Sequence, residues 1–155
     1  MTLPSQRKED AEVLRLALLT GLIRVADAVA WADDAIMSDT RPGSAVIDVA
    51  LSGHRTAYEM AALLAAVPGV ADPVRVIRRH LGDLLRVLDR DLEHTRRVVA
   101  RLSTMAWDET LADPRFDARR AALLAEDYDE ATWGIHGSEA AARDAIRQYL
   151  LQHAL

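Results

Sequence analysis

A single apolar stripe at helical spacing runs through the middle of the chain, from Asp72-Pro73 to residue 106. Most of its members recur at steps of three or four residues: Val74, Ile77, Leu81, Leu84, Leu85, Leu88, Leu92, Val98, Val99 and Leu102. Such steps put side chains on one face of an α-helix, whereas a strand would need strict alternation. The chain must therefore contain a long amphipathic helical stretch whose apolar face other segments cover.

This stretch is too long to be one helix. At 1.5 Å per residue it would extend about 50 Å, which exceeds the width expected of a domain of 155 residues. We expect a break between Leu88 and Glu93, where three charged residues are adjacent. Gly82 is the second candidate position for the break, because glycine weakens a helix interior.

Capping residues, turn residues and apolar spacing predict further helices on both sides of the stripe. The expected helices cover residues 6–20, 25–38, 45–51, 54–67, 114–125 and 138–153, with a short helical turn over 128–133. Residues 45–51 also alternate as a strand does, and we favour a helix because a lone strand would have no partner. Ser5 is the expected cap of the first helix, and 54–67, which includes Tyr58, is apolar almost all round and should be a central buried helix. The fold class is therefore all-α, a single domain over 1–155 with about seven or eight antiparallel helices.

Composition supports a folded protein of the cytoplasm. Half of the residues are hydrophobic and 28% are charged, which is typical of a globular domain. The absence of cysteine excludes disulfides and thiolate chemistry. No apolar run approaches the roughly 18 residues needed to span a bilayer, so no membrane partner is expected. Lys8 is the only lysine, and all other members of the Lys+Arg set are arginine. This preference for arginine, together with the abundant alanine, suggests a GC-rich bacterial genome.

The stripe segment is basic inside an acidic protein. Residues 73–106 carry 8 basic and 4 acidic groups, whereas the whole chain has a net charge of −5. Its arginines raise nucleic-acid binding as an alternative function: Arg75, Arg78, Arg79, Arg86, Arg96, Arg97 and Arg101. A phosphate-binding surface needs a strongly positive potential, which an isoelectric point near 5.5 disfavours. We expect these arginines to pair with the acidic segments on either side, and nucleic acid is not the expected partner.

The segment from Trp107 to Trp133 combines aromatic residues with most of the excess negative charge. It contains 8 acidic and 3 basic residues. Aromatic side chains supply contact area in protein interfaces, and carboxylates attract basic partners. The candidate partner-binding residues are Trp107, Asp108, Glu109, Glu126, Asp127, Tyr128, Asp129, Glu130 and Trp133. The alternative is that the tryptophans belong to the core and the carboxylates only solvate the surface.

The residues give no signature of an enzyme. The chain lacks a P-loop and any Glu-x-x-His pair of the kind that di-iron bundles use, and no set of nucleophile and base is recognisable. We therefore assign no catalytic residue, no cofactor and no metal site. A metal-dependent hydrolase that uses clustered carboxylates, first among them Glu126, Asp129 and Glu130, remains as an alternative.

One short stretch resembles known proteins. Gly21-Leu22-Ile23 and Trp31-Ala32-Asp33, within residues 21–38, resemble a pattern in small uncharacterised all-helical bacterial proteins, some of which are similar to immunity proteins of toxin systems. The resemblance implies no catalytic or binding residues. Combined with the acidic and aromatic segment, it predicts a non-catalytic protein-interaction module, in one form an immunity-type binder of a basic partner. A homodimer is left open.

Overall fold

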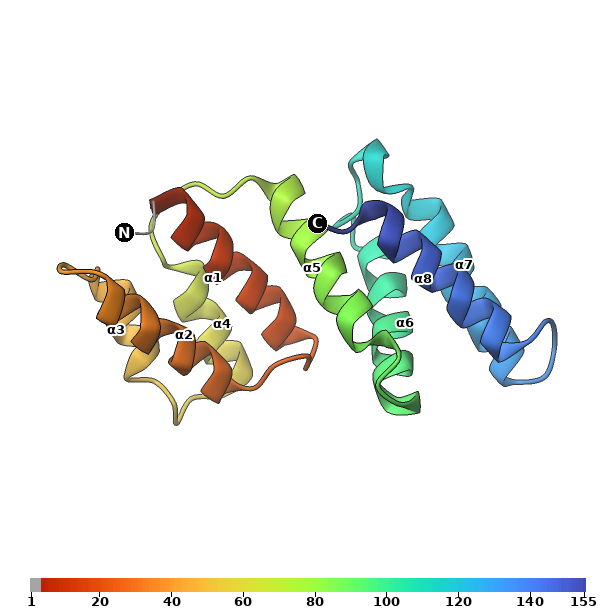
Figure 1. The fold of residues 1–155 in the computed structure, drawn as a ribbon, viewed down its shortest axis with the longest axis horizontal. Helices are drawn as coiled ribbons and strands as arrows, with labels where there is room; N and C mark the ends of the chain where they lie inside the picture. The colour runs from red at the N-terminus through yellow and green to blue at the C-terminus, as the bar shows by residue number, and fades with distance from the viewer. Residues whose placement is uncertain (1–3) are drawn as a thin grey trace. The chain divides into compact units, whose positions relative to one another are not determined.

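The computed structural model describes residues 4–155, and these residues form α-helices and one 3-10 helix without any strand (Figure 1). The elements are α1 (Pro4–Leu19), α2 (Val25–Ser38), α3 (Ser44–Ala50), α4 (Ala57–Ala65), α5 (Pro73–Leu88), α6 (Leu92–Trp107), η1 (Pro114–Phe116), α7 (Ala118–Thr132) and α8 (Glu139–His153). The predicted all-α class and the predicted number of helices are confirmed. None of the helices in this part of the chain has both the length and the apolar character needed to cross a bilayer.

The chain divides into two compact units, and the division falls within α5. The first unit ends at Val76 and the second comprises Ile77–Leu155. Each unit has buried apolar side chains of its own. A single domain over the whole chain and an antiparallel order of its helices therefore stay predictions.

The first unit packs α1 on α4 and α2 on α3 (Figure 1). Its core consists of small and medium side chains: Ala11, Leu18, Ala28, Ala32, Val46, Val49, Met60, Ala61, Leu64 and Val67. Thr56 caps α4 by accepting a hydrogen bond from the Glu59 backbone N–H, and the Glu59 carboxylate accepts one from the Thr56 backbone N–H. This reciprocal capping box fixes the start of the helix.

The second unit packs α7 between α6 and α8 (Figure 1). Its largest buried side chains come from all of its helices and from the connection before α7: Leu81, Leu84, Leu88, Leu102, Met105, Leu111, Phe116, Leu124, Tyr128 and Ile146. This core is larger in side-chain volume than the alanine-rich core of the first unit. It holds α6 and α7 in the arrangement that forms the candidate site.

The apolar stripe breaks where the length argument places the break. Helix α5 ends at Leu88 and α6 begins at Leu92, and the Asp91 carboxylate caps α6 by accepting from the His94 backbone N–H at 2.8 Å. The buried Thr95 hydroxyl donates to the Leu88 carbonyl oxygen at 2.6 Å. That bond satisfies a carbonyl at the end of α5, which would otherwise lack a helical partner.

Gly82, the second candidate for the break, lies inside α5. A Cβ atom at this position would be only 3.0 Å from the Leu155 carbonyl oxygen. The chain is held there because the Leu155 N–H donates to the Arg78 carbonyl oxygen, and the Arg78 guanidinium donates to the carbonyl oxygens of His153 and Ala154. The glycine thus allows the main chain after α8 to pack closely on α5.

One titratable side chain is completely buried in the second unit. His80 on α5 has no exposed surface, and its Nε2 accepts a hydrogen bond from Nε of Arg101 at 3.2 Å. Burial disfavours the charged imidazolium, and the Arg101 guanidinium repels it, so the pKa of His80 falls to about 3. The imidazole is therefore neutral at physiological pH.

Several predicted element boundaries are wrong. Ser5 is inside α1 and does not precede it. Helix α4 is shorter than 54–67, and Tyr58 on it is 80% exposed, so this helix is not apolar on all sides. The segments expected over 114–125 and 128–133 are instead a 3-10 turn followed by one continuous helix, α7. The preference for a helix over a strand at 45–51 is confirmed, because α3 covers Ser44–Ala50.

Candidate functional site

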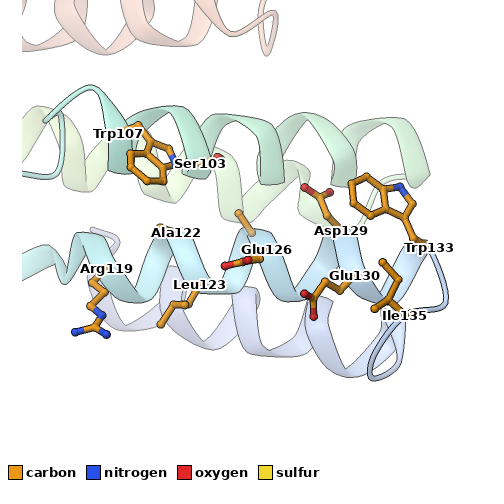
Figure 2. Close-up of a pocket in the computed structure, with 11 residues that line it drawn as sticks. Ser103, Trp107, Arg119, Ala122, Leu123, Glu126, Asp129, Glu130, Trp133 and Ile135 are labelled. Atoms are coloured by element: carbon orange, nitrogen blue, oxygen red, sulfur yellow. The ribbon is translucent and has the colours of Figure 1, made fainter.

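A groove of about 540 Å³ lies between α6 and α7 in the second unit (Figure 2). Helix α6 contributes two of its lining residues, and α7 with the turn after it contributes the others. The groove is lined by Ser103, Trp107, Arg119, Ala122, Leu123, Ala125, Glu126, Asp129, Glu130, Trp133 and Ile135. It combines exposed aromatic and aliphatic surface with carboxylates.

Helix α7 separates a core face from a groove face. Ala121, Leu124, Ala125 and Tyr128 recur at steps of three or four and are buried. The flank beside them carries Ala122, Glu126, Asp129 and Trp133, again at steps of three or four. Because an α-helix turns about 100° per residue, these two series follow adjacent lines along the same helix. The packing of the first series therefore fixes where the second series points.

Apolar side chains stand at both ends of the groove. Trp107, the last residue of α6, is 80% exposed and lies beside the N-terminal part of α7 (Figure 2). At the other end are Trp133 and Ile135, which are 73% and 65% exposed. Large hydrophobic side chains exposed at one site are a feature of interaction surfaces.

The turn after α7 explains why Trp133 and Ile135 reach the groove together. The Gly134 N–H donates to the Ala131 carbonyl oxygen, and the Ile135 N–H donates to the Glu130 carbonyl oxygen at 2.9 Å. Gly134 has a φ of 71°, in the left-handed region that favours glycine. These two hydrogen bonds and the left-handed residue form a Schellman motif. The motif turns the chain back so that Ile135 lies beside the last turn of α7.

The carboxylates of the groove have no partner within residues 4–155. No hydrogen bond or ion pair in this part of the chain engages the side chains of Glu126, Asp129 and Glu130. Arg119, at the opposite end of the groove, also forms no such contact. The four ionisable side chains that line the groove therefore give it a net charge of −2.

The structure brings five of the nine predicted partner-binding residues together in this groove. These five are Trp107, Glu126, Asp129, Glu130 and Trp133. Asp108, Glu109 and Asp127 are exposed but do not line it, and the Asp108 carboxylate accepts from the Thr110 N–H after α6.

Tyr128 lies elsewhere. Its side chain is 1% exposed, and its hydroxyl donates to Oε1 of Glu139 at 3.1 Å. Burial and this hydrogen bond to an anion raise the pKa of Tyr128 above its usual value. Its ring belongs to the core, so we remove Tyr128 from the candidate partner-binding set.

Sequence reasoning missed the remaining lining residues. Arg119, Leu123 and Ile135 lie one or more helical turns from the acidic residues, and Ser103 lies one turn before Trp107 on α6. Extending the spacing of three and four residues from Glu126 in both directions would have found Arg119 and Leu123. Ile135 depends on the chain reversal at Gly134, and Ser103 on the packing of α6 against α7.

The alternatives find less support in the geometry. Among residues 4–155, no three histidine or acidic side chains lie close enough together to hold a metal ion, so Glu126, Asp129 and Glu130 do not form a ligand set. Most arginines of α5 and α6 are engaged within the protein, whereas Arg96 forms no hydrogen bond or ion pair within residues 4–155. Their contacts include Arg75 with Glu9, Arg78 with the carbonyl oxygens of residues 153 and 154, Arg86 with Asp83, Arg97 with Glu93, and Arg101 with His80 and Asp108. We expected the partners to lie in the flanking acidic segments. Glu9 and Asp108 do so, whereas Asp83 and Glu93 are on the same helices as the arginines with which they pair.

No protein-family model matches this chain, and comparisons with curated proteins and with solved structures also gave no match.

Proposed function

We propose that the protein is a non-catalytic interaction module that binds a basic protein partner at the groove between α6 and α7. The observation that carries this proposal is the presence of unpaired carboxylates and exposed tryptophans on one surface. Glu126, Asp129 and Glu130 lack partners, whereas Trp107 and Trp133 leave most of their area in water.

The energetics of association favour this use of the groove. Tryptophans contribute strongly to binding when a partner covers them. Carboxylates increase the association rate with basic proteins and select against acidic ones. The specific form that we propose is an immunity-type protein, which would bind and block a basic toxin in the cytoplasm of a bacterial cell.

The test is capture of a partner by the immobilised full chain from lysates of the source cells. The decisive variant combines Glu126→Lys, Asp129→Lys and Glu130→Lys. The matched control combines Asp33→Lys, Asp34→Lys and Asp48→Lys, which changes the net charge by the same amount at exposed carboxylates of the first unit.

We expect the wild type and the control variant to retain the same basic protein, identified by mass spectrometry, and the groove variant to lose it. Retention should weaken as salt concentration rises, because exposed charges are screened. Equal capture by the groove variant and the wild type would contradict the proposal. Circular dichroism of both variants verifies that they are folded.

A further inference from the structure

The walls of the groove restrict the conformation of a bound segment. Both walls are α-helices, whose interior N–H and C=O groups bond within the helix itself. An extended peptide would therefore find no row of free backbone groups to pair with, unlike a peptide that joins the edge of a sheet. A helical segment satisfies its own backbone, so it can enter the groove without leaving polar groups unpaired.

The length and the apolar ends of the groove set the size of the segment. From Arg119 to Trp133 the groove follows α7 for fourteen residue steps, which corresponds to about 21 Å. A helix of about four turns covers that distance. Its apolar stripe would contact Trp107 and Leu123 at one end and Trp133 at the other. Helix-in-groove recognition uses apolar anchors at this kind of spacing.

The charges along the groove are unequally distributed. Asp129 and Glu130 lie toward the Trp133 end and Arg119 lies at the Trp107 end, with Glu126 between them (Figure 2). The N-terminus of any helix carries a partial positive charge and its C-terminus a partial negative charge. A bound helix is therefore favoured when its N-terminal half, with its basic residues, lies against the carboxylates and its C-terminus lies near Arg119.

We propose that the groove receives a basic amphipathic helix of about four turns from another protein, with its basic N-terminal half at the Trp133 end. This inference rests on the proposed function and adds the conformation and direction of the partner segment. A second copy of this chain fits less well. Its own basic amphipathic helix, α5, has the apolar residues Leu81, Leu84 and Leu88 buried in the folded chain.

The test uses three stapled synthetic peptides of about 16 residues, a length that spans the groove. All three have the same composition. The first has an apolar helical stripe with its lysines and arginines in the N-terminal half, the second has the same stripe with them in the C-terminal half, and the third has a scrambled order without a stripe. Affinity for the full chain is measured by titration calorimetry.

We expect the first peptide to bind at least tenfold more tightly than the other two. Arg119→Ala should reduce the preference for the first peptide over the second, because it removes the positive end of the charge distribution. Equal affinities of the first two peptides would overturn the proposed direction. Equal affinities of all three, or no binding of the first peptide, would overturn the helical partner.

A paramagnetic label on the peptide tests the direction independently. With the label at the N-terminus of the first peptide, the indole N–H signal of Trp133 should broaden more than that of Trp107. Trp31 in the first unit is the reference signal. Stronger broadening of Trp107 would overturn the inference, as would formation of a dimer through the groove in light scattering.

The two proposals fail in different ways. Partner capture that depends on the groove carboxylates, together with equal binding of all three peptides, overturns only the helical inference. Capture that is indifferent to the groove carboxylates overturns the proposed function and the inference with it.

Discussion

Helices α1 and α7 both carry several acidic residues, but they use them differently. On α1, the Glu9 carboxylate lies 3.3 Å from Nε of Arg75, and the Glu12 carboxylate lies 2.7 Å from both Nζ of Lys8 and Nε of Arg15. On α7, the groove carboxylates have no partner among residues 4–155. The carboxylates of α1 are therefore part of the fold of the first unit, whereas those of α7 are available to another molecule.

The largest expected effect on stability separates the two faces of α7. Tyr128→Ala should lower the free energy of unfolding by about 4 kcal/mol, because it removes a fully buried ring and leaves a cavity. Trp133→Ala should change it by less than about 0.5 kcal/mol, since the indole is mostly exposed. Urea unfolding of both variants measures the difference. A comparable loss for Trp133→Ala would mean that this tryptophan is structural, and it would contradict the distinction between a buried and an exposed face of α7.

Acidification should affect the second unit through His80. In the unfolded chain the pKa of histidine is about 6.5, whereas the pKa of buried His80 is about 3. Between these values the unfolded chain binds a proton that the folded protein does not, so stability is lost as pH falls. From pH 7 to pH 5 the loss due to this group should be about 2 kcal/mol. Urea unfolding at the two pH values should give this loss for the wild type, with a smaller addition from His153, whose pKa is also lowered by burial. The His80→Phe variant should keep only that smaller part.

The first unit should respond to acid in a different pH range. Burial by itself would raise the pKa of Glu12, but hydrogen bonds and charge interactions with Lys8 and Arg15 lower it below the usual value of 4.5. Its contribution to stability is therefore complete above that value and is lost as pH falls through the lower folded pKa. Between pH 7 and pH 5 Glu12 should contribute little pH dependence. A His80→Phe variant that keeps the full loss over that range would contradict the assignment to His80.

The smallest expected effect on stability is the difference between neutralising one carboxylate on α1 and neutralising one on α7. Glu12→Gln should lower the free energy of unfolding by about 1 kcal/mol, because two half-buried cations lose their counter-charge. Glu126→Gln should leave it unchanged within about 0.3 kcal/mol, the range expected of a surface substitution. Thermal unfolding at low salt detects the difference. Equal losses would show that α7 uses its carboxylates for folding as α1 does.

Sequence reasoning located the helices well where local signals agree. Residues 25–38 are helical as predicted, and the break after Leu88 was predicted from the length of the stripe and from the adjacent charged residues at 89–91. The division of 114–133 into two helical segments was wrong, because α7 continues without a break through the acidic residues in its middle. The steps from Ala121 through Leu124 to Tyr128 carried the correct signal, and they also indicate that Tyr128 is buried.

The candidate site was only partly accessible from the sequence. Composition alone drew attention to Trp107, Glu126 and Trp133, because aromatic and acidic residues are concentrated there. It could not tell which of them share a surface, since that depends on how α6 packs on α7. The complete burial of His80 also depends on tertiary packing, although its spacing from Ile77 and Leu84 places it on the apolar stripe.

The most direct test of the central claim follows the tryptophan indole N–H signals during titration with the captured partner. The chain has three tryptophans, and two of them line the groove. We expect the signals of Trp107 and Trp133 to shift on binding while that of Trp31 stays unchanged. Binding that shifts Trp31 alone, or leaves both groove tryptophans unaffected, would contradict the central claim.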